Sequence, residues 1–119
     1  MTAGRPEALS AVTVGVTDMA ASCAFYDALG FEAVHGGPAA PFTSYAVGGG
    51  FLNLQLVDRV EVGWGRFIVH VDDVDAVYDR ARAAGFTPTM APSDAPWGER
   101  YFHIDDPDGH EVSFARPLG

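Results

Sequence analysis

The sequence predicts an α+β domain made of two tandem β-α-β-β-β modules. The first observation behind this prediction is an internal repeat, in which Val14-Gly-Val-Thr-Asp-Met19 aligns with Val69-His-Val-Asp-Asp-Val74 at a spacing of 55 residues. The same register, without a gap, places Gly30-Phe31 on Gly85-Phe86. Two copies of this length indicate a duplicated domain and not a solenoid, which needs three or more shorter units.

The second observation is that each copy shows the same order of patterns. Residues 9–16 and 66–71 alternate between apolar and small or polar residues, which is typical of half-buried strands. Asp18 in the first copy, and Asp72 or Asp73 in the second, would cap a helix that ends at the repeated glycine. Three further strands are expected after each helix, at about 31–35, 43–47 and 51–56 in the first copy and about 87–90, 100–105 and 110–115 in the second.

A turn near the C-terminus supports the last pair of strands. Asp106-Pro-Asp-Gly109 has Asp, Pro and Gly at the first, second and fourth positions of a type I turn, so it predicts a hairpin. We therefore expect one domain over residues 1–119, with module one at about 8–60 and module two at about 61–117.

Composition and charge narrow the classes of function. Sixteen acidic and seven basic residues give a formal net charge of -9, which argues against nucleic acid and anionic membrane surfaces as partners. No apolar run could cross a bilayer, and the segment Met1–Ser10 does not resemble a secretory signal. The single cysteine, Cys23, excludes a disulfide framework and is expected in the core. We expect a cytoplasmic protein that binds neither nucleic acid nor a membrane.

The alternation divides the strands into two faces of different character. One face is wholly apolar and should pack under the helices, with Val12, Val14, Val16, Leu52, Leu54, Leu56, Phe67, Val69, Val71, Phe102, Ile104, Val112 and Phe114. The other face mixes aromatic, amide, imidazole and charged groups, and the chain contains no lysine. An ordinary solvated face is one interpretation of this second set. A small-molecule pocket, which combines apolar walls with a few polar groups, is the interpretation that we favour.

The predicted ligand-binding residues come from this second face and from two adjoining tryptophans. The tryptophans could stack on a planar or cationic ligand, or pack at a dimer contact. The predicted set is Phe51, Asn53, Gln55, Trp64, Arg66, His70, Trp97, Tyr101, His103, Glu111 and Ser113.

Two motifs resemble those of a known family. The opening segment, Val14–Met19 with Ser22-Cys-Ala-Phe-Tyr26 and Leu29-Gly-Phe31, is similar to the start of the vicinal oxygen chelate superfamily. The segments Trp97-Gly-Glu-Arg100 and Asp106–Ser113 are similar to its closing strands. The superfamily includes glyoxalase I, extradiol dioxygenases and bleomycin resistance proteins. The resemblance implies two modules that form a curved mixed sheet around a cup, and a homodimer.

The resemblance also locates the positions at which metal-dependent members carry four ligands. In this sequence those positions hold Ala11, Asn53, Arg66 and Ser113. Alanine has no donor atom, arginine stays cationic, and asparagine and serine offer only weak neutral oxygens. We therefore expect that the chain holds neither the metal of the family nor another cofactor.

Three interpretations of the function remain open from the sequence. The first is a metal-free protein that binds a small hydrophobic, aromatic or cationic molecule in the cup, in the manner of antibiotic-binding members. The alternative is a lyase, isomerase or dioxygenase that uses side-chain acid–base groups or a displaced metal site at His70, His103 and Glu111. The sequence identifies no catalytic residue, and a small interaction module without a ligand is a third reading.

Overall fold

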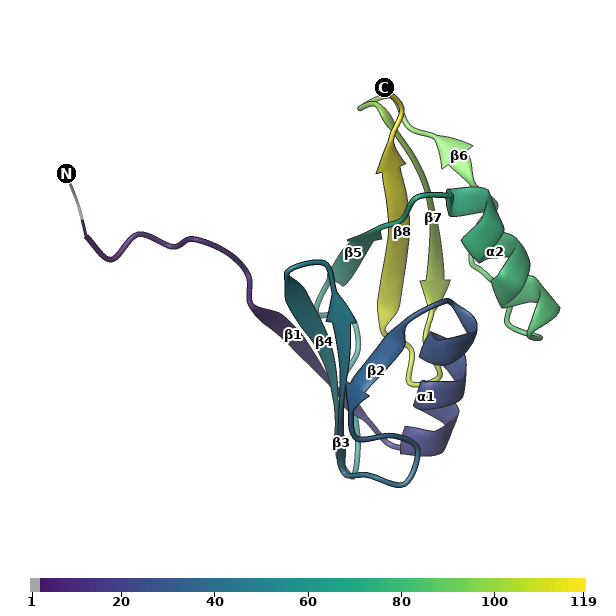
Figure 1. The fold of residues 1–119 in the computed structure, drawn as a ribbon. Coiled ribbons are helices and arrows are strands. Elements are labelled where there is room, and N and C mark those ends of the chain that lie inside the picture. Colours follow the sequence, from purple (N-terminus) through teal and green to yellow (C-terminus); the bar gives the residue numbers. More distant parts are fainter. Residues whose placement is uncertain (1–2) are drawn as a thin grey trace.

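The structure, a computed structural model, describes residues 3–119 and contains the two modules in the predicted order (Figure 1). The first module consists of β1 (Ala11–Val16), α1 (Met19–Ala28), β2 (Glu32–His35), β3 (Phe42–Val47) and β4 (Gly50–Leu56). The second consists of β5 (Arg66–His70), α2 (Val74–Ala83), β6 (Ser93–Asp94), β7 (Glu99–Asp105) and β8 (Glu111–Pro117). No helix within residues 3–119 is long and apolar enough to cross a membrane.

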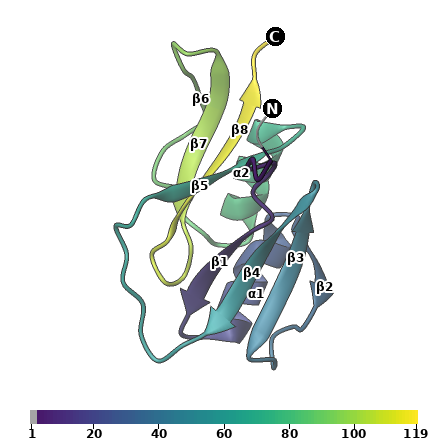
Figure 2. The ribbon, with the colours of Figure 1, turned by 90° about the vertical axis from the view of Figure 1, so that its left-hand side faces the viewer.

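The strands form two four-stranded mixed sheets with the same topology. Their orders are β1-β4-β3-β2 and β5-β8-β7-β6, so the first and last strands of each module are parallel neighbours and the remaining pairs are antiparallel. Both helices lie on one side of the sheets (Figure 1). The opposite faces of the two sheets are open and look in the same general direction, with the helices behind them (Figure 2). The α+β prediction and the duplicated β-α-β-β-β topology are confirmed.

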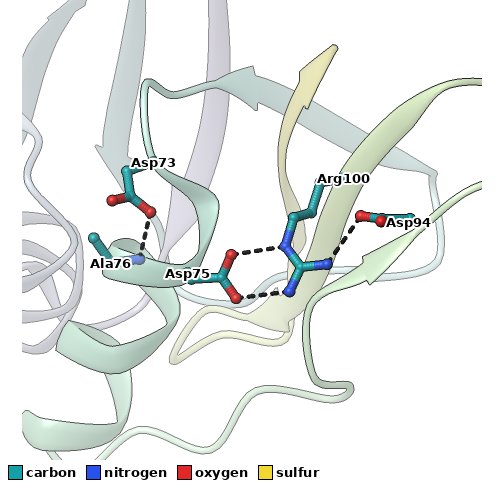
Figure 3. Close-up of polar contacts among 5 residues, drawn as sticks. All are labelled: Asp73, Asp75, Ala76, Asp94 and Arg100. Atoms are coloured by element: carbon teal, nitrogen blue, oxygen red, sulfur yellow. Dashed lines mark hydrogen bonds and ion pairs between the residues drawn. The ribbon is translucent and has the colours of Figure 1, made fainter. Parts of the chain in front are cut away.

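The helices begin and end where the repeat predicts. The carboxylate of Asp18 accepts a hydrogen bond from the backbone N–H of Ala21 at 3.0 Å. Asp73 does the same for Ala76 at 3.0 Å, so it is Asp73 and not Asp72 that caps α2 (Figure 3). Gly30 and Gly85, with φ angles of 97° and 92°, follow the helices in a conformation that residues with a Cβ rarely adopt.

Aromatic residues join the two modules into one hydrophobic core. The ring of Phe31 lies 6.0 Å from that of Phe114, and the ring of Phe25 lies 5.0 Å from that of Phe86, both in edge-on geometry. Cys23 is buried in the same core, as predicted. The apolar face of the strands therefore does pack under the helices across both modules.

A polar clamp also ties the modules together at the β7–β8 turn, which has the predicted hairpin geometry. The buried carboxylate of Asp106 accepts hydrogen bonds from the Tyr26 hydroxyl on α1 at 2.7 Å and from the backbone N–H groups of Asp108 and His110. The side chain of Asp108 in turn bonds the hydroxyl of Thr17, after β1, at 2.6 Å. Burial raises the pKa of Asp106, and burial together with the charge of Asp106 raises the pKa of Tyr26.

Two predictions about the strands are wrong. No strand forms at 87–90; the short strand β6 lies further along the chain, at Ser93–Asp94, where no strand was expected. Pro88 and Pro92 lack the N–H that a ladder requires, and only Thr89 bonds the backbone of β7, at His103. Leu56, expected in the core, is 45 % exposed because it ends β4 and has no partner on β3.

Candidate ligand-binding site

An apolar hollow lies where the two modules meet, between the start of β1 and β4 on one side and β5 on the other. Its volume is about 220 Å³. Phe51 and Ile68 line it from the open faces of the two sheets, and both remain unusually exposed for large apolar side chains. Residues of both β1 and β5 line the hollow, although the two strands belong to different sheets and do not pair. Its other apolar lining comes from Leu9, Ala11, Val12, Val47, Leu52, Phe67 and Val69.

Polar side chains begin directly beside this hollow on the second sheet. Ile68 lies opposite Ser113 on β8, and Ser113 lies opposite His103 on β7. The Ser113 hydroxyl and the His103 Nδ1 are 2.8 Å apart and share a hydrogen bond. One row further along, the Arg66 Nε donates to the Glu111 carboxylate at 2.5 Å. The register of these strands therefore places a hydroxyl, an imidazole and an ion pair at one rim of the hollow.

An aromatic row follows on β7. The ring of Tyr101 lies 5.4 Å from that of Trp97 and 5.2 Å from that of His103. Glu99 fixes the outer end of this row, because its carboxylate accepts a hydrogen bond from the Trp97 indole N–H at 2.9 Å and lies 3.1 Å from the His70 Nε2. The row offers flat ring surfaces next to a negative charge, which suits a planar or cationic group.

The first sheet contributes a second polar row. The Ser44 hydroxyl donates to the Asn53 Oδ1 at 2.6 Å, and the Asn53 Nδ2 donates to the Thr13 hydroxyl at 3.2 Å. The three residues lie side by side on β3, β4 and β1. Gln55 follows on β4, exposed to solvent. The hollow is thus flanked by polar groups on both sheets.

A clamp on the helix side holds the corner of the second sheet where Trp97 lies. The guanidinium of Arg100 bonds both carboxylate oxygens of Asp75, on α2, at 2.7 and 2.8 Å and one oxygen of Asp94, on β6, at 2.9 Å (Figure 3). These hydrogen bonds lower the pKa of the Asp75 carboxyl and raise the pKa of Arg100. Arg100 thereby connects α2, β6 and β7 around the turn that presents the aromatic row.

Ten of the eleven predicted site residues lie on these open faces or beside them. Phe51, Asn53 and Gln55 belong to the first sheet, and the members from β5, β7 and β8 belong to the second, with Trp97 against Tyr101. Trp64 is the exception. Its indole N–H donates to the Nδ1 of His110 at 3.0 Å, beside the outer edge of β1.

Two residues that shape the site, Leu9 and Ser44, are not among the residues predicted from the sequence. Leu9 lines the hollow, and it could have been found because it continues the alternation of Ala11 and Thr13 toward the N-terminus. Ser44 holds the amide of Asn53, and only the register of β3 against β4 reveals that contact.

The side chains at the four family metal positions do not fit a metal ion. Ala11 has no donor atom, and the guanidinium of Arg66 is a cation already paired with Glu111. The carbonyl oxygen of Asn53 accepts a hydrogen bond from Ser44, and the hydroxyl of Ser113 is bonded to His103. None of these groups is a ligand that binds divalent metals well.

The displaced metal site is not assembled either. His70, His103 and Glu111 each contact a different partner, namely Glu99, Ser113 and Arg66. Over residues 3–119, no group of three or more His, Cys, Asp or Glu side chains is arranged to hold a metal ion. What this face offers chemically is hydrogen bonding, stacking and a histidine within reach of the hollow.

Comparisons with known proteins agree with this architecture. A family model described as the Glyoxalase/Bleomycin resistance protein/Dioxygenase superfamily matches residues 8–114. The crystal structure of TioX from Micromonospora sp. ML1 is 27 % identical with a TM-score of 0.77, and the alignment covers 94 % of this chain and 100 % of that one. Lactoylglutathione lyase from Agrobacterium tumefaciens is 26 % identical with a TM-score of 0.75, covering 93 % and 94 %.

A curated relative matches over a shorter stretch. An uncharacterized protein of Mycobacterium bovis is 46 % identical over 48 residues, which are 40 % of this chain and 32 % of the relative. The matched stretch therefore spans about a third of that relative's length. The family match, in contrast, extends through both modules. The chain belongs to the Glyoxalase/Bleomycin resistance protein/Dioxygenase superfamily.

Proposed function

We propose that the chain binds a small molecule with an apolar, aromatic body in the hollow between the modules, without the help of a metal ion. The observation that carries this proposal is the position of an apolar hollow directly beside rows of hydrogen-bonding side chains. Such a combination binds the body of a ligand by burial and orients it through a few polar contacts. The unsuitable side chains at the metal positions support binding that needs no metal.

Each part of the face has its own role in this proposal. Phe51 and Ile68 contact the apolar body, since both line the hollow from the open side. His103 and Arg66 lie at one rim, where they would contact a polar end. Trp97 and Tyr101 extend the surface for a planar or cationic group, with the carboxylate of Glu99 beside them.

We further propose that two copies of the chain pair through these open faces. A volume of about 220 Å³ lies below the range of about 300–1,000 Å³ that is usual for ligand pockets, so one chain leaves the site partly open. A second chain would cover the exposed side chains of Phe51, Ile68 and Trp97. We expect light scattering after size-exclusion chromatography to give twice the mass of the 12.6 kDa chain. A monomer at micromolar concentration would contradict the pairing but not the binding.

A thermal-shift panel tests the binding proposal. The panel would contain thioflavin T as a cationic aromatic probe, anilinonaphthalene sulfonate as an anionic one, and bleomycin because of the family name. A compound present at about 100 times its Kd should stabilise the native state by about 2.7 kcal/mol, a rise in Tm of about 10 °C for a domain of this size.

The same panel measured after treatment with EDTA provides the control. Because the proposal involves no metal, the rise in Tm should be unchanged by the chelator. A rise that disappears with EDTA and returns with a divalent metal would contradict metal-free binding. The absence of a shift with all three compounds of the panel would contradict the proposed function.

A further inference from the structure

A second hollow lies outside the site described above, at the outer edge of β1. Its volume is about 340 Å³, within the usual range for small-molecule pockets. One wall is the stretch Val12–Gly15 of β1, and the other is the linker between the modules, residues 57–65. The linker has no counterpart within either repeat, so this hollow is a product of joining the modules.

One wall of this hollow is held in place by a buried histidine. His110 lies 2.7 Å from the backbone oxygen of Gly15 through its Nε2 and 3.0 Å from the indole nitrogen of Trp64 through its Nδ1. The oxygen can only accept and the indole N–H can only donate, so Nε2 carries the hydrogen and Nδ1 carries none. Trp64 is therefore fixed before any ligand arrives, while half of its surface remains exposed.

The floor of the hollow is apolar, and a glycine makes it possible. A Cβ at Gly15 would lie 2.9 Å from Val57 Cγ2 and 3.7 Å from Val60 Cγ2. The missing side chain thus lets both linker valines pack against β1. Together with Trp64, these valines form a surface that suits an aliphatic or aromatic side chain.

Two opposite charges line the same hollow. Arg59 and Glu61 both contribute to its wall, and within residues 3–119 neither side chain enters an ion pair or a hydrogen bond with another residue. In contrast, the charges on the face of the second sheet, Arg66 with Glu111 and His70 with Glu99, contact each other. A ligand in this hollow would meet a positive and a negative group, each without a partner.

We propose that this second hollow binds a small zwitterion with an apolar side chain, such as an aliphatic or aromatic α-amino acid. Arg59 pairs with the carboxylate of the ligand, Glu61 pairs with its ammonium group, and the side chain packs on Trp64 and the valines. An acid without an amine would leave Glu61 beside the ligand unpaired, and an amine without an acid would leave Arg59 unpaired. The inference is independent of the proposed function, because the two hollows share only Val12.

Calorimetric titration with L-phenylalanine tests the proposal. We expect saturable binding at millimolar or lower concentration, and at least tenfold weaker binding of 3-phenylpropionate and 2-phenylethylamine, which each lack one charge. Arg59→Gln and Glu61→Gln should each weaken binding of L-phenylalanine at least tenfold. Both side chains are exposed, so these variants should fold normally.

Two controls locate the binding. Arg66→Gln and Ile68→Asn, in the hollow between the modules, should leave the affinity for L-phenylalanine unchanged. In the Trp97→Phe background the indole emission comes from Trp64 alone, since the chain has two tryptophans, and it should change on titration. No saturable binding, equal affinity for all three compounds, or equal affinity in the Arg59 and Glu61 variants would overturn the proposal.

Discussion

Replacing Asp106 by alanine is expected to lower the free energy of unfolding by about 3 kcal/mol, because three hydrogen-bond donors would lose their acceptor in a buried place. These donors are the Tyr26 hydroxyl at 2.7 Å and the backbone N–H groups of His110 at 2.9 Å and Asp108 at 3.0 Å. Tyr26 is fully buried, so its hydroxyl cannot turn to water instead. Urea unfolding followed by circular dichroism measures the loss.

Two further variants make this measurement specific. Asp105→Ala removes the neighbouring exposed carboxylate and should change stability by less than about 0.5 kcal/mol. Asp106→Asn keeps an oxygen for the two backbone N–H groups, so it should cost much less than the alanine variant. Equal losses in Asp105→Ala and Asp106→Ala would show that the clamp between the modules does not stabilise the fold.

The same carboxyl should make stability depend on pH. Burial raises the pKa of Asp106 in the folded state above that of an unfolded chain, so the folded state holds the proton more tightly. The stability that this tighter proton binding adds is therefore complete below the ordinary carboxyl pKa. It is lost as the pH rises through the raised pKa of the folded state. The stability of the wild type relative to Asp106→Asn should fall over that interval in urea titrations at a series of pH values. A constant difference would contradict the raised pKa.

Replacing Ile68 by asparagine is expected to weaken binding of the aromatic panel compound roughly 30-fold, or by about 2 kcal/mol. The substitution places an amide without a partner in the apolar hollow, and the amide must lose water when the ligand enters. Because asparagine is neutral, we expect binding to become weaker for a cationic and for an anionic ligand alike. Fluorescence or calorimetric titration measures the change.

A matched control exists on the first sheet. Val34 on β2 is 60 % exposed and Ile68 is 59 % exposed, so Val34→Asn makes a similar change at a similar exposure outside the hollow. The affinity of Val34→Asn for the aromatic panel compound should equal that of the wild type. If both asparagine variants bind as the wild type does, the aromatic body does not lie between the modules.

The local parts of the fold could be predicted from the sequence because they depend on neighbouring residues. Asp18 and Asp73 cap helices through backbone groups three residues away, and the Asp106–Gly109 turn depends only on its own four residues. The failure at 87–90 has a local cause as well, since Pro88 stands in that stretch and Pro92 follows two residues after it. Neither proline has the backbone N–H group that a strand at this position would need for its ladder.

From the sequence, only the face of the sheets that carries the site could be predicted, and not the hollow itself. Alternation correctly assigned residues such as Phe51, Arg66 and His103 to the side away from the helices, because side-chain direction in a strand repeats every two residues. The hollow itself is lined by both β1 and β5. Nothing in the sequence of either strand indicates that they come together, because they belong to different sheets. The contact between Trp64 and His110 spans 46 residues and was equally hidden.

The most direct test of binding between the modules is a crystal structure of the protein with the panel compound that gives the largest rise in Tm. The proposal predicts electron density for the aromatic body between Phe51 and Ile68, with its polar end toward His103 or Arg66. Density for the compound at another surface, with this hollow open to solvent, would contradict the proposal.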